Sequence, residues 1–268
     1  MEERPIRIGL ALGGGAVRGA AHIGVLDVLD RAGLEPAVIT GTSAGALVGA
    51  LYASGRSPSE IAKLAQTLRW ARLIRPGLTR KALFETSKLA VFLDDTLSSL
   101  TFEELERPFA AVACDLTTGR EVVMREGPVA SAVLASAAIP GVFPPVDREG
   151  HLLVDGGLVT MVPAALAREM GADIVVAVDV SGPLPRRPPN TLIHIMVAVS
   201  TLQPGGGDRL EEDADLVLNP EVDEYAFWEL SRIPEFEQAG RDAATRALPL
   251  LRALVAEAEA RRAWHRDR

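Results

Sequence analysis

Short apolar runs alternate with helical patterns along most of the 268-residue chain. Several runs are unbroken stretches of Val, Ile and Ala, as expected for strands that are covered on both faces. The predicted strands span residues 6–12, 37–40, 109–114, 121–125, 151–154, 174–180, 191–196 and 216–218. Apolar positions spaced by three and four predict a helix over 17–32, and Ser57-Pro58 predicts the start of another. This alternation predicts an α/β fold, a three-layer α/β/α sandwich with a central, mainly parallel sheet.

Three segments depart from the alternation. Residues 69–107 contain no clear strand, and we expect them to form an excursion or lid near a functional site. Residues 182–190 contain four prolines and predict a rigid loop. A long amphipathic pattern over 236–258 predicts a C-terminal helix that Pro249 kinks or divides. We treat residues 1–268 as a single domain, with its core at about 5–250 and a C-terminal helix end and tail at 251–268.

Composition narrows the classes of function. Apolar residues make up 48% of the chain, enough for a sizeable core, and the net charge of −8 favours neither nucleic acid nor an anionic membrane. The single cysteine, Cys114, excludes an internal disulfide and lies in an apolar run, which predicts a buried core thiol. The N-terminus does not resemble a secretion signal, and no run of 18 apolar residues is uninterrupted. We expect a cytoplasmic protein, peripheral at most at the inner membrane surface.

A glycine-rich segment follows the first predicted strand. Gly13, Gly14, Gly15 and Arg18 lie where the strand passes into a helix. The dinucleotide fingerprint requires glycine at Arg18, and the phosphate loop requires Lys and Ser or Thr where Ala20 and Ala21 stand, so neither fits. The remaining readings are a plain tight turn, or a loop whose backbone N–H groups stabilise an oxyanion.

A Gly-x-Ser-x-Gly pattern lies between the second predicted strand and a helix. Gly41 and Gly45 flank Ser43 and allow a sharp turn that exposes the serine oxygen as a nucleophile. The helix that begins there adds its N-terminal dipole to any anion formed. The alternative is that Ser43 only caps the helix.

A nucleophilic serine requires a base. None of the four histidines, His22, His151, His194 and His265, lies in a loop directly after a predicted strand, so a Ser-His-Asp triad is weakly supported. Asp155 ends a short apolar strand and precedes two glycines, a position comparable to that of Ser43. Its pKa must be raised by burial if it is to act as the base, and the alternative is an Asp-Gly turn residue.

Together these segments resemble the patatin-like phospholipases, and most closely the small bacterial cytoplasmic members. The resemblance rests on residues 13–19, 21–26, 41–45, 113–119, 136–144, 155–157 and 176–181, in that order. It implies the three-layer fold, a catalytic dyad of Ser43 and Asp155, and an oxyanion site shaped by Gly13–Gly15 and Arg18. Many relatives carry glycine where this chain has Ala16, and we expect alanine to be accommodated there with a negative φ.

The resemblance implies hydrolysis of phospholipid or lysophospholipid esters through an acyl-enzyme, without metal or other cofactor. We expect Asp115 and Asp179, in segments that also resemble the family, to hold loops structurally. The expected partner is a lipid or ester substrate. For residues 261–268 two alternatives remain: transient contact with a membrane surface, or a frayed helix end. A catalytically silent lipid-binding or regulatory protein stays open, and the oligomeric state is not predicted.

Overall fold

A central mixed sheet, mostly parallel, organises the molecule. The computed structural model describes residues 4–69, 73–77, 81–182, 190–200, 207–222 and 228–266. Within them eight strands form one sheet in the order β10-β9-β1-β2-β5-β8-β7, with β6 paired to β5 off this path. The strands are β1 (Ile8–Leu12), β2 (Val38–Thr42), β5 (Phe109–Asp115), β6 (Arg120–Met124), β7 (Val146–Arg148), β8 (His151–Asp155), β9 (Ile174–Val178) and β10 (Leu216–Leu218). Strands β10, β9, β1, β2 and β5 are parallel, whereas β6 and β8 pair antiparallel with β5, and β7 with β8.

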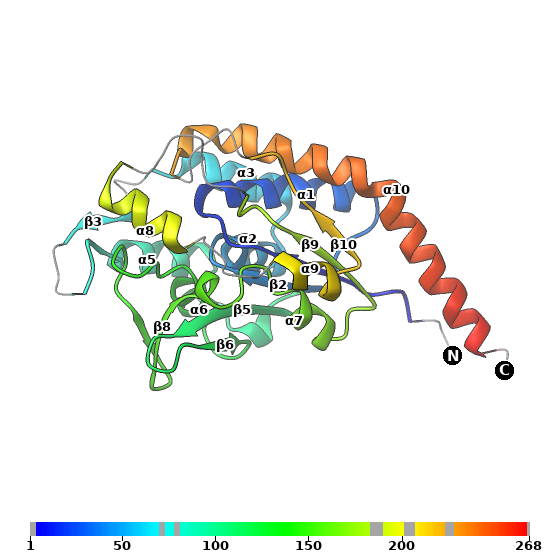
Figure 1. Ribbon diagram of the computed structural model, residues 1–268, viewed down its shortest axis with the longest axis horizontal. Coiled ribbons are helices and arrows are strands. Elements are labelled where there is room, and N and C mark those ends of the chain that lie inside the picture. The colour runs from blue at the N-terminus through cyan, green and yellow to red at the C-terminus, as the bar shows by residue number, and fades with distance from the viewer. Residues whose placement is uncertain are drawn as a thin grey trace.

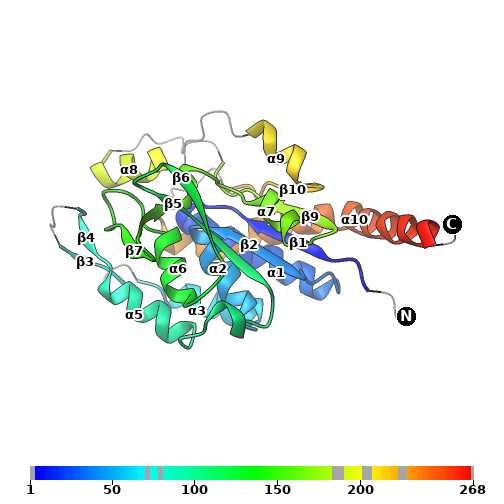
Figure 2. The ribbon, with the colours of Figure 1, turned by 90° about the horizontal axis from the view of Figure 1, so that it is seen from below.

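Helices cover both faces of this sheet (Figures 1 and 2). Alternate side chains of β1 show the two faces: Leu10 and Leu12 pack with helices α1 (Ala21–Arg31), α2 (Ala44–Ala53) and α10 (Ile233–Arg266), whereas Ala11 packs with α7 (Ala164–Glu169). Helix α9 (Gly207–Asp213) lies on the α7 side and α6 (Val129–Ser136) on the α2 side. The predicted three-layer α/β/α architecture is confirmed.

Small residues allow the layers to approach closely. A Cβ on Gly24 of α1 would lie 1.9 Å from the carbonyl oxygen of Glu237, and one on Gly240 of α10 would lie 1.9 Å from that of Ala21. The two helices therefore pack backbone against backbone. This packing explains how a chain with only 4% aromatic residues fills its core.

Helix α3 (Pro58–Thr67) begins as predicted. The Ser57 hydroxyl accepts a hydrogen bond from the Glu60 N–H, and the Glu60 carboxylate accepts one from the Ser57 N–H. This reciprocal capping satisfies two amides of the first turn, and Pro58 stands where no amide is needed.

The predicted strand at 191–196 is wrong. These residues belong to helix α8 (Leu192–Ser200), whose His194 N–H donates to the Thr191 hydroxyl at 3.2 Å as in an N-terminal cap. A continuous apolar run has no periodicity that separates a buried strand from a helix. Tertiary packing favours the helix here, because one side of α8 packs on an apolar cluster that contains Phe143.

Residues 81–107 hold little strand, and the C-terminal helix is continuous. Among the described residues from 69 to 107, the strands are β3 (Arg75–Pro76) and β4 (Phe84–Glu85), each two residues long, and helix α5 (Ser87–Thr96) and a 3-10 turn at Phe102–Glu104 follow them. Pro249 lies inside α10 and does not divide it, although Figure 1 shows the helix bent along its length. Most of the proline-rich loop, residues 183–189, lies outside the described residues.

Candidate active site

Ser43 occupies a strained turn between β2 and α2. Its φ of 53° and ψ of −117° form a conformation that side chains other than glycine rarely adopt. Such a residue costs about 1–3 kcal/mol and persists only where its surroundings hold it. The strain matches the geometry of a nucleophile elbow, in which the serine side chain is presented at the carboxyl end of a strand.

The flanking glycines are needed for close packing. A Cβ on Gly45 would lie 2.1 Å from the carbonyl oxygen of Leu12, and a Cβ on Gly41 would lie 2.6 Å from that of Gly45. A side chain at Gly45 would push the turn away from β1, and one at Gly41 would push it away from the start of α2. The glycines predicted to form the elbow therefore allow the chain to fold back on itself.

Ser136 holds the strained turn, a role that the sequence did not suggest. Its hydroxyl accepts a hydrogen bond from the Ser43 N–H at 2.8 Å and donates one to the Val112 carbonyl at 2.6 Å. The side chain is completely buried. Ser136 lies in a segment that carries the family resemblance, but 93 positions separate it from Ser43, so no local pattern could reveal the contact.

Asp155 lies within hydrogen-bonding distance of the serine. The Ser43 hydroxyl donates to Oδ2 of Asp155 at 2.7 Å, and the Gly157 N–H donates to Oδ1 at 2.8 Å. Burial raises the pKa of Asp155 from 3.8 to about 6, although both hydrogen bonds oppose this change. The carboxylate is thus more basic than an exposed one and is still ionised at neutral pH.

A small chamber adjoins Ser43 and Asp155, and the glycine loop forms part of its lining. Gly14, Gly15 and Ala16 line it together with Ser43 and Asp155. The N–H of Gly13 donates to the Val178 carbonyl at 3.0 Å, and that of Gly14 donates to the Met161 carbonyl at 3.1 Å. The N–H groups of Gly15, Ala16 and Ala44 have no acceptor among the residues that the structure describes.

Ala16 adopts a positive φ of 50°, so the expectation of a negative φ is wrong. The left-handed conformation crowds the Cβ against the backbone, which explains why glycine suits this position. Gly15, just before it, packs closely on Val180, where a Cβ would lie 2.8 Å from the valine Cγ2, and Ala16 adopts the strained conformation beside this contact.

Two buried side chains, those of His22 and Arg18, make hydrogen bonds at or near the glycine loop. Nε2 of His22 donates to the Gly13 carbonyl at 2.8 Å, and its Nδ1 has no hydrogen-bond partner within the described ranges. Burial lowers the pKa of His22 to about 4, so the ring is neutral near pH 7. Arg18 is fully buried and donates to the Ser181 carbonyl at 2.8 Å, and its side chain lines neither cavity at the site.

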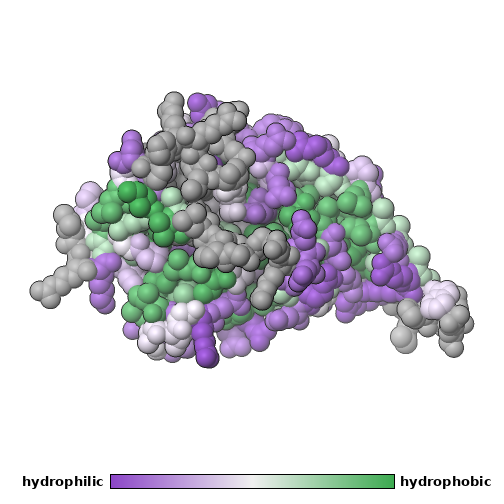
Figure 3. All heavy atoms as spheres, viewed as in Figure 1, coloured by the Kyte–Doolittle hydropathy of each residue, from purple (hydrophilic) through white to green (hydrophobic). Residues whose placement is uncertain are grey.

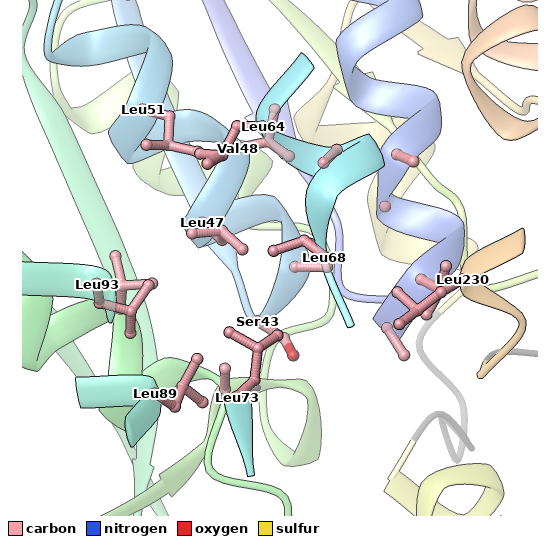
Figure 4. Close-up of a pocket in the computed structure, with 18 of the residues that line it drawn as sticks. Ser43, Leu47, Val48, Leu51, Leu64, Leu68, Leu73, Leu89, Leu93 and Leu230 are labelled. Atoms are coloured by element: carbon pink, nitrogen blue, oxygen red, sulfur yellow. The ribbon is translucent and has the colours of Figure 1, made fainter. Parts of the chain in front are cut away.

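An apolar cavity of about 190 Å³ opens beside Ser43 (Figure 4). Ser43 is the only member with a polar side chain among the described residues that line it. The walls include residues of α2, α3, α5 and α6, among them Leu47 and Leu89, and Leu73 from the segment between α3 and β3. The region at 69–107 therefore contributes side chains to the cavity beside Ser43, and its role as a lid stays a prediction.

The other ionisable candidates have structural partners. His151 Nδ1 lies 3.0 Å from Oδ2 of Asp115, a contact that lowers the pKa of Asp115 to about 2. Asp115 also accepts the Thr117 N–H, and Asp179 accepts the N–H and hydroxyl of Ser181, so both hold loops as expected.

His194 Nδ1 lies 3.0 Å from Asn190 Oδ1, and its ring stacks on Trp228. His22, His151 and His194 thus each contact a group other than Ser43, which leaves the histidine triad without support among them. Cys114 is buried, as predicted.

The described residues contain neither a cluster of metal ligands nor a membrane-spanning helix. No group of three or more His, Cys, Asp or Glu side chains there could hold a metal ion. No described helix combines the length and apolar character needed to cross a bilayer.

The sequence matches known proteins. Residues 10–168 match the family model of the patatin-like phospholipases. An uncharacterized NTE family protein of Mycobacterium bovis is 38% identical over 179 residues, which cover 66% of this chain and 49% of that protein. The human patatin-like phospholipase domain-containing protein 6 is 37% identical over 183 residues, 65% of this chain and 13% of the human protein. The chain thus spans half or less of the length of these relatives.

Solved structures share the fold. VipD from Legionella pneumophila superposes with a TM-score of 0.60 at 14% identity, covering 95% of this chain and 67% of VipD. ExoU in its complex with SpcU from Pseudomonas aeruginosa gives a TM-score of 0.51 at 19% identity, covering 92% of this chain and 52% of that chain. Because the family model covers more than half of the sequence, the chain belongs to the patatin-like phospholipase family.

Proposed function

We propose that this protein is a serine acyl hydrolase that cleaves carboxylic esters of phospholipids or lysophospholipids. The observation that carries the proposal is the 2.7 Å hydrogen bond from the Ser43 hydroxyl to the buried carboxylate of Asp155. A weakly basic carboxylate becomes an effective general base when its pKa approaches the working pH, and burial moves Asp155 in that direction.

The reaction would proceed in two steps. Asp155 takes the proton from Ser43 Oγ as this oxygen attacks the ester carbonyl, and it then returns the proton to the departing alcohol or lysolipid. Water attacks the acyl-enzyme with Asp155 again acting as base, which releases the fatty acid and restores Ser43.

The oxyanion would be held by backbone amides. The N–H groups of Gly15 and Ala16, and that of Ala44 after the nucleophile, are the candidate donors, because those of Gly13 and Gly14 already donate to carbonyls. Gly13, Gly14 and Arg18 would shape the loop. Removal of one such donor typically costs about 10²–10³ in kcat.

The cavity supports a substrate with an acyl chain. Its lining carries no charge, and it begins at the nucleophile, so a hydrocarbon tail in the cavity would place its carboxyl carbon near Ser43. Burial of each methylene contributes about 0.8 kcal/mol, which favours long chains over short ones.

The test combines ester hydrolysis with active-site labelling. Ser43→Ala should abolish hydrolysis of p-nitrophenyl butyrate and labelling by a fluorophosphonate probe, and Asp155→Asn should lose hydrolysis to a comparable extent. Ser99→Ala is a matched control, because Ser99 is exposed and its hydroxyl bonds the Asp94 carboxylate, far from Ser43 in the sequence. Labelling that persists in Ser43→Ala, or a large loss from His194→Ala, would contradict the proposed dyad, and an unlabelled wild-type protein would indicate a catalytically silent member.

A further inference from the structure

Helix α8 exposes an apolar face. Leu192, Ile195 and Val199 are 57%, 46% and 55% exposed, and their spacing of three and four places them on one side of the helix. The nine residues of α8 include no Asp, Glu, Lys or Arg. Figure 3 shows hydrophobic residues gathered at the place that α8 occupies in Figure 1. We call these three side chains the α8 face.

The opposite side of α8 is part of the reaction site. Val197 is buried and lines the small chamber together with Ser43 and Asp155. Ile193 and Met196 pack in the cluster that contains Phe143, which also lines the acyl cavity. Since a helix with its side chains is about 10–12 Å thick, only this thickness separates the α8 face from the chamber.

Other apolar side chains near the site are also exposed. Leu158 and Val159 follow Asp155 by three and four residues and are 44% and 37% exposed. Isolated exposed apolar residues need no explanation, but several around one catalytic chamber do.

We propose that the α8 face docks on the surface of a zwitterionic lipid layer and so brings the chamber to its substrate, an inference that rests on the proposed function. The absence of charge on α8 fits an occupant whose surface is neutral overall, and the net charge of −8 disfavours an anionic one. A lipid ester that reacts at Ser43 has to leave such a layer, and this face is the apolar surface next to the chamber.

A second protein is a poorer occupant for this face. Stable protein interfaces use about 20–30 residues from each partner, whereas the α8 face comprises three. Partial insertion of a few aliphatic side chains is sufficient for reversible contact with a lipid surface.

The C-terminal end of α10 offers a built-in comparison. Trp264 is 53% exposed there, and Figures 1 and 2 both show this end on the opposite side of the molecule from α8. Leu250, also 53% exposed and also helical, is a matched control for Leu192. Glutamine is the substitution of choice, because it removes apolar surface without adding charge and favours helix.

The experiment measures flotation with phosphatidylcholine vesicles in a Ser43→Ala background, so that the lipid stays intact. The double variant Leu192→Gln, Ile195→Gln should partition at least about tenfold less, because a buried Leu or Ile contributes more than the free energy of one tenfold change. Leu250→Gln and Trp264→Gln should partition like the parent. With Ser43 present, the double variant should cleave vesicle phosphatidylcholine more slowly and p-nitrophenyl butyrate at the parental rate.

Several results would overturn the docking proposal: a parent that does not float, a double variant that floats like the parent, or an equal loss from Leu250→Gln. A dimer in sedimentation that dissociates only in the double variant would instead assign the face to a second copy. Ester cleavage without flotation would refute docking alone, whereas flotation through the α8 face without any ester cleavage would refute the proposed function alone.

Discussion

Replacement of Asp155 by asparagine should stabilise the protein at neutral pH while it removes activity. The carboxyl is buried, and its pKa rises from 3.8 to about 6 on folding. At about 1.36 kcal/mol per pKa unit, keeping this group ionised in the folded state costs about 3 kcal/mol. Asparagine has nearly the same shape: its oxygen can accept the Gly157 N–H, and its NH₂ can donate to the Ser43 oxygen, so the substitution removes the charge and retains both contacts.

The effect has a defined pH window. Between about pH 4 and pH 6 the folded protein binds the Asp155 proton more tightly than the unfolded chain, so the stabilising contribution of the protonated carboxyl is complete below pH 4 and is lost as the pH rises through 6. The wild-type protein and Asp155→Asn should therefore be similarly stable near pH 4. At pH 7.5 the variant should gain up to about 3 kcal/mol, or roughly 6–10 °C in Tm.

The assay is urea unfolding of both proteins at each pH, with the difference in unfolding free energy as the measured quantity. Other carboxylates change the absolute stability with pH, for example Asp115 with its lowered pKa, and the difference cancels them. A gain of equal size at both pH values, or a loss at pH 7.5, would refute a raised pKa and with it the physical basis for Asp155 as a base.

Three further predictions concern the cavity and the glycine loop. The kcat/KM for p-nitrophenyl esters should rise about fourfold per added methylene of the acyl chain until the cavity is full. Leu47→Trp should make kcat/KM level off at shorter chains and leave hydrolysis of the acetate ester unchanged. A kcat/KM that does not vary with chain length would refute acyl binding in the cavity. Ala16→Gly should leave the unfolding free energy unchanged or raise it by up to about 1 kcal/mol, whereas Ala253→Gly on the exposed part of α10 should cost about 1 kcal/mol; equal losses would argue against strain at Ala16. His22→Leu should cost about 1–3 kcal/mol and lower kcat, because the buried Gly13 carbonyl loses its donor, and unchanged stability would show that another group replaces it.

Most of the strands could be predicted because their environment imposes a simple pattern. Strands β1, β5 and β9 are buried on both faces, so they appear as unbroken apolar runs bounded by turns. The same reasoning failed for α8, because its apolar residues are shared between the chamber side and an exposed side. The three-residue strand β7 went unpredicted because such a strand depends on pairing with β8 rather than on its own pattern.

The candidate residues of the site were predictable, but their contacts were not. Ser43 follows β2 and Asp155 ends β8, and the sequence suggested that both lie at the carboxyl ends of parallel strands. The structure brings them together in another way, because β8 runs antiparallel to β5 and pairs Asp155 with Ala113, one residue beyond the partner of Thr42. The role of Ser136 could not be predicted, because its hydroxyl contacts the Ser43 backbone amide, which lies in a distant segment of the sequence. Which amides of the glycine loop are left without an acceptor depends on which N–H groups already donate to β9 and to residue 161, and only the assembled loops define this.

Local sequence alone determines several elements of this protein, without reference to long-range contacts. The glycines around Ser43, the apolar runs of the strands and the Ser57 cap act over a few residues, so they can be recognised directly in the sequence. The basicity of Asp155, the positive φ of Ala16 and the helical state of residues 192–200 arise from burial and packing between segments far apart in sequence. Desolvation and steric contact act on positions in space, and for that reason only the folded arrangement could determine them.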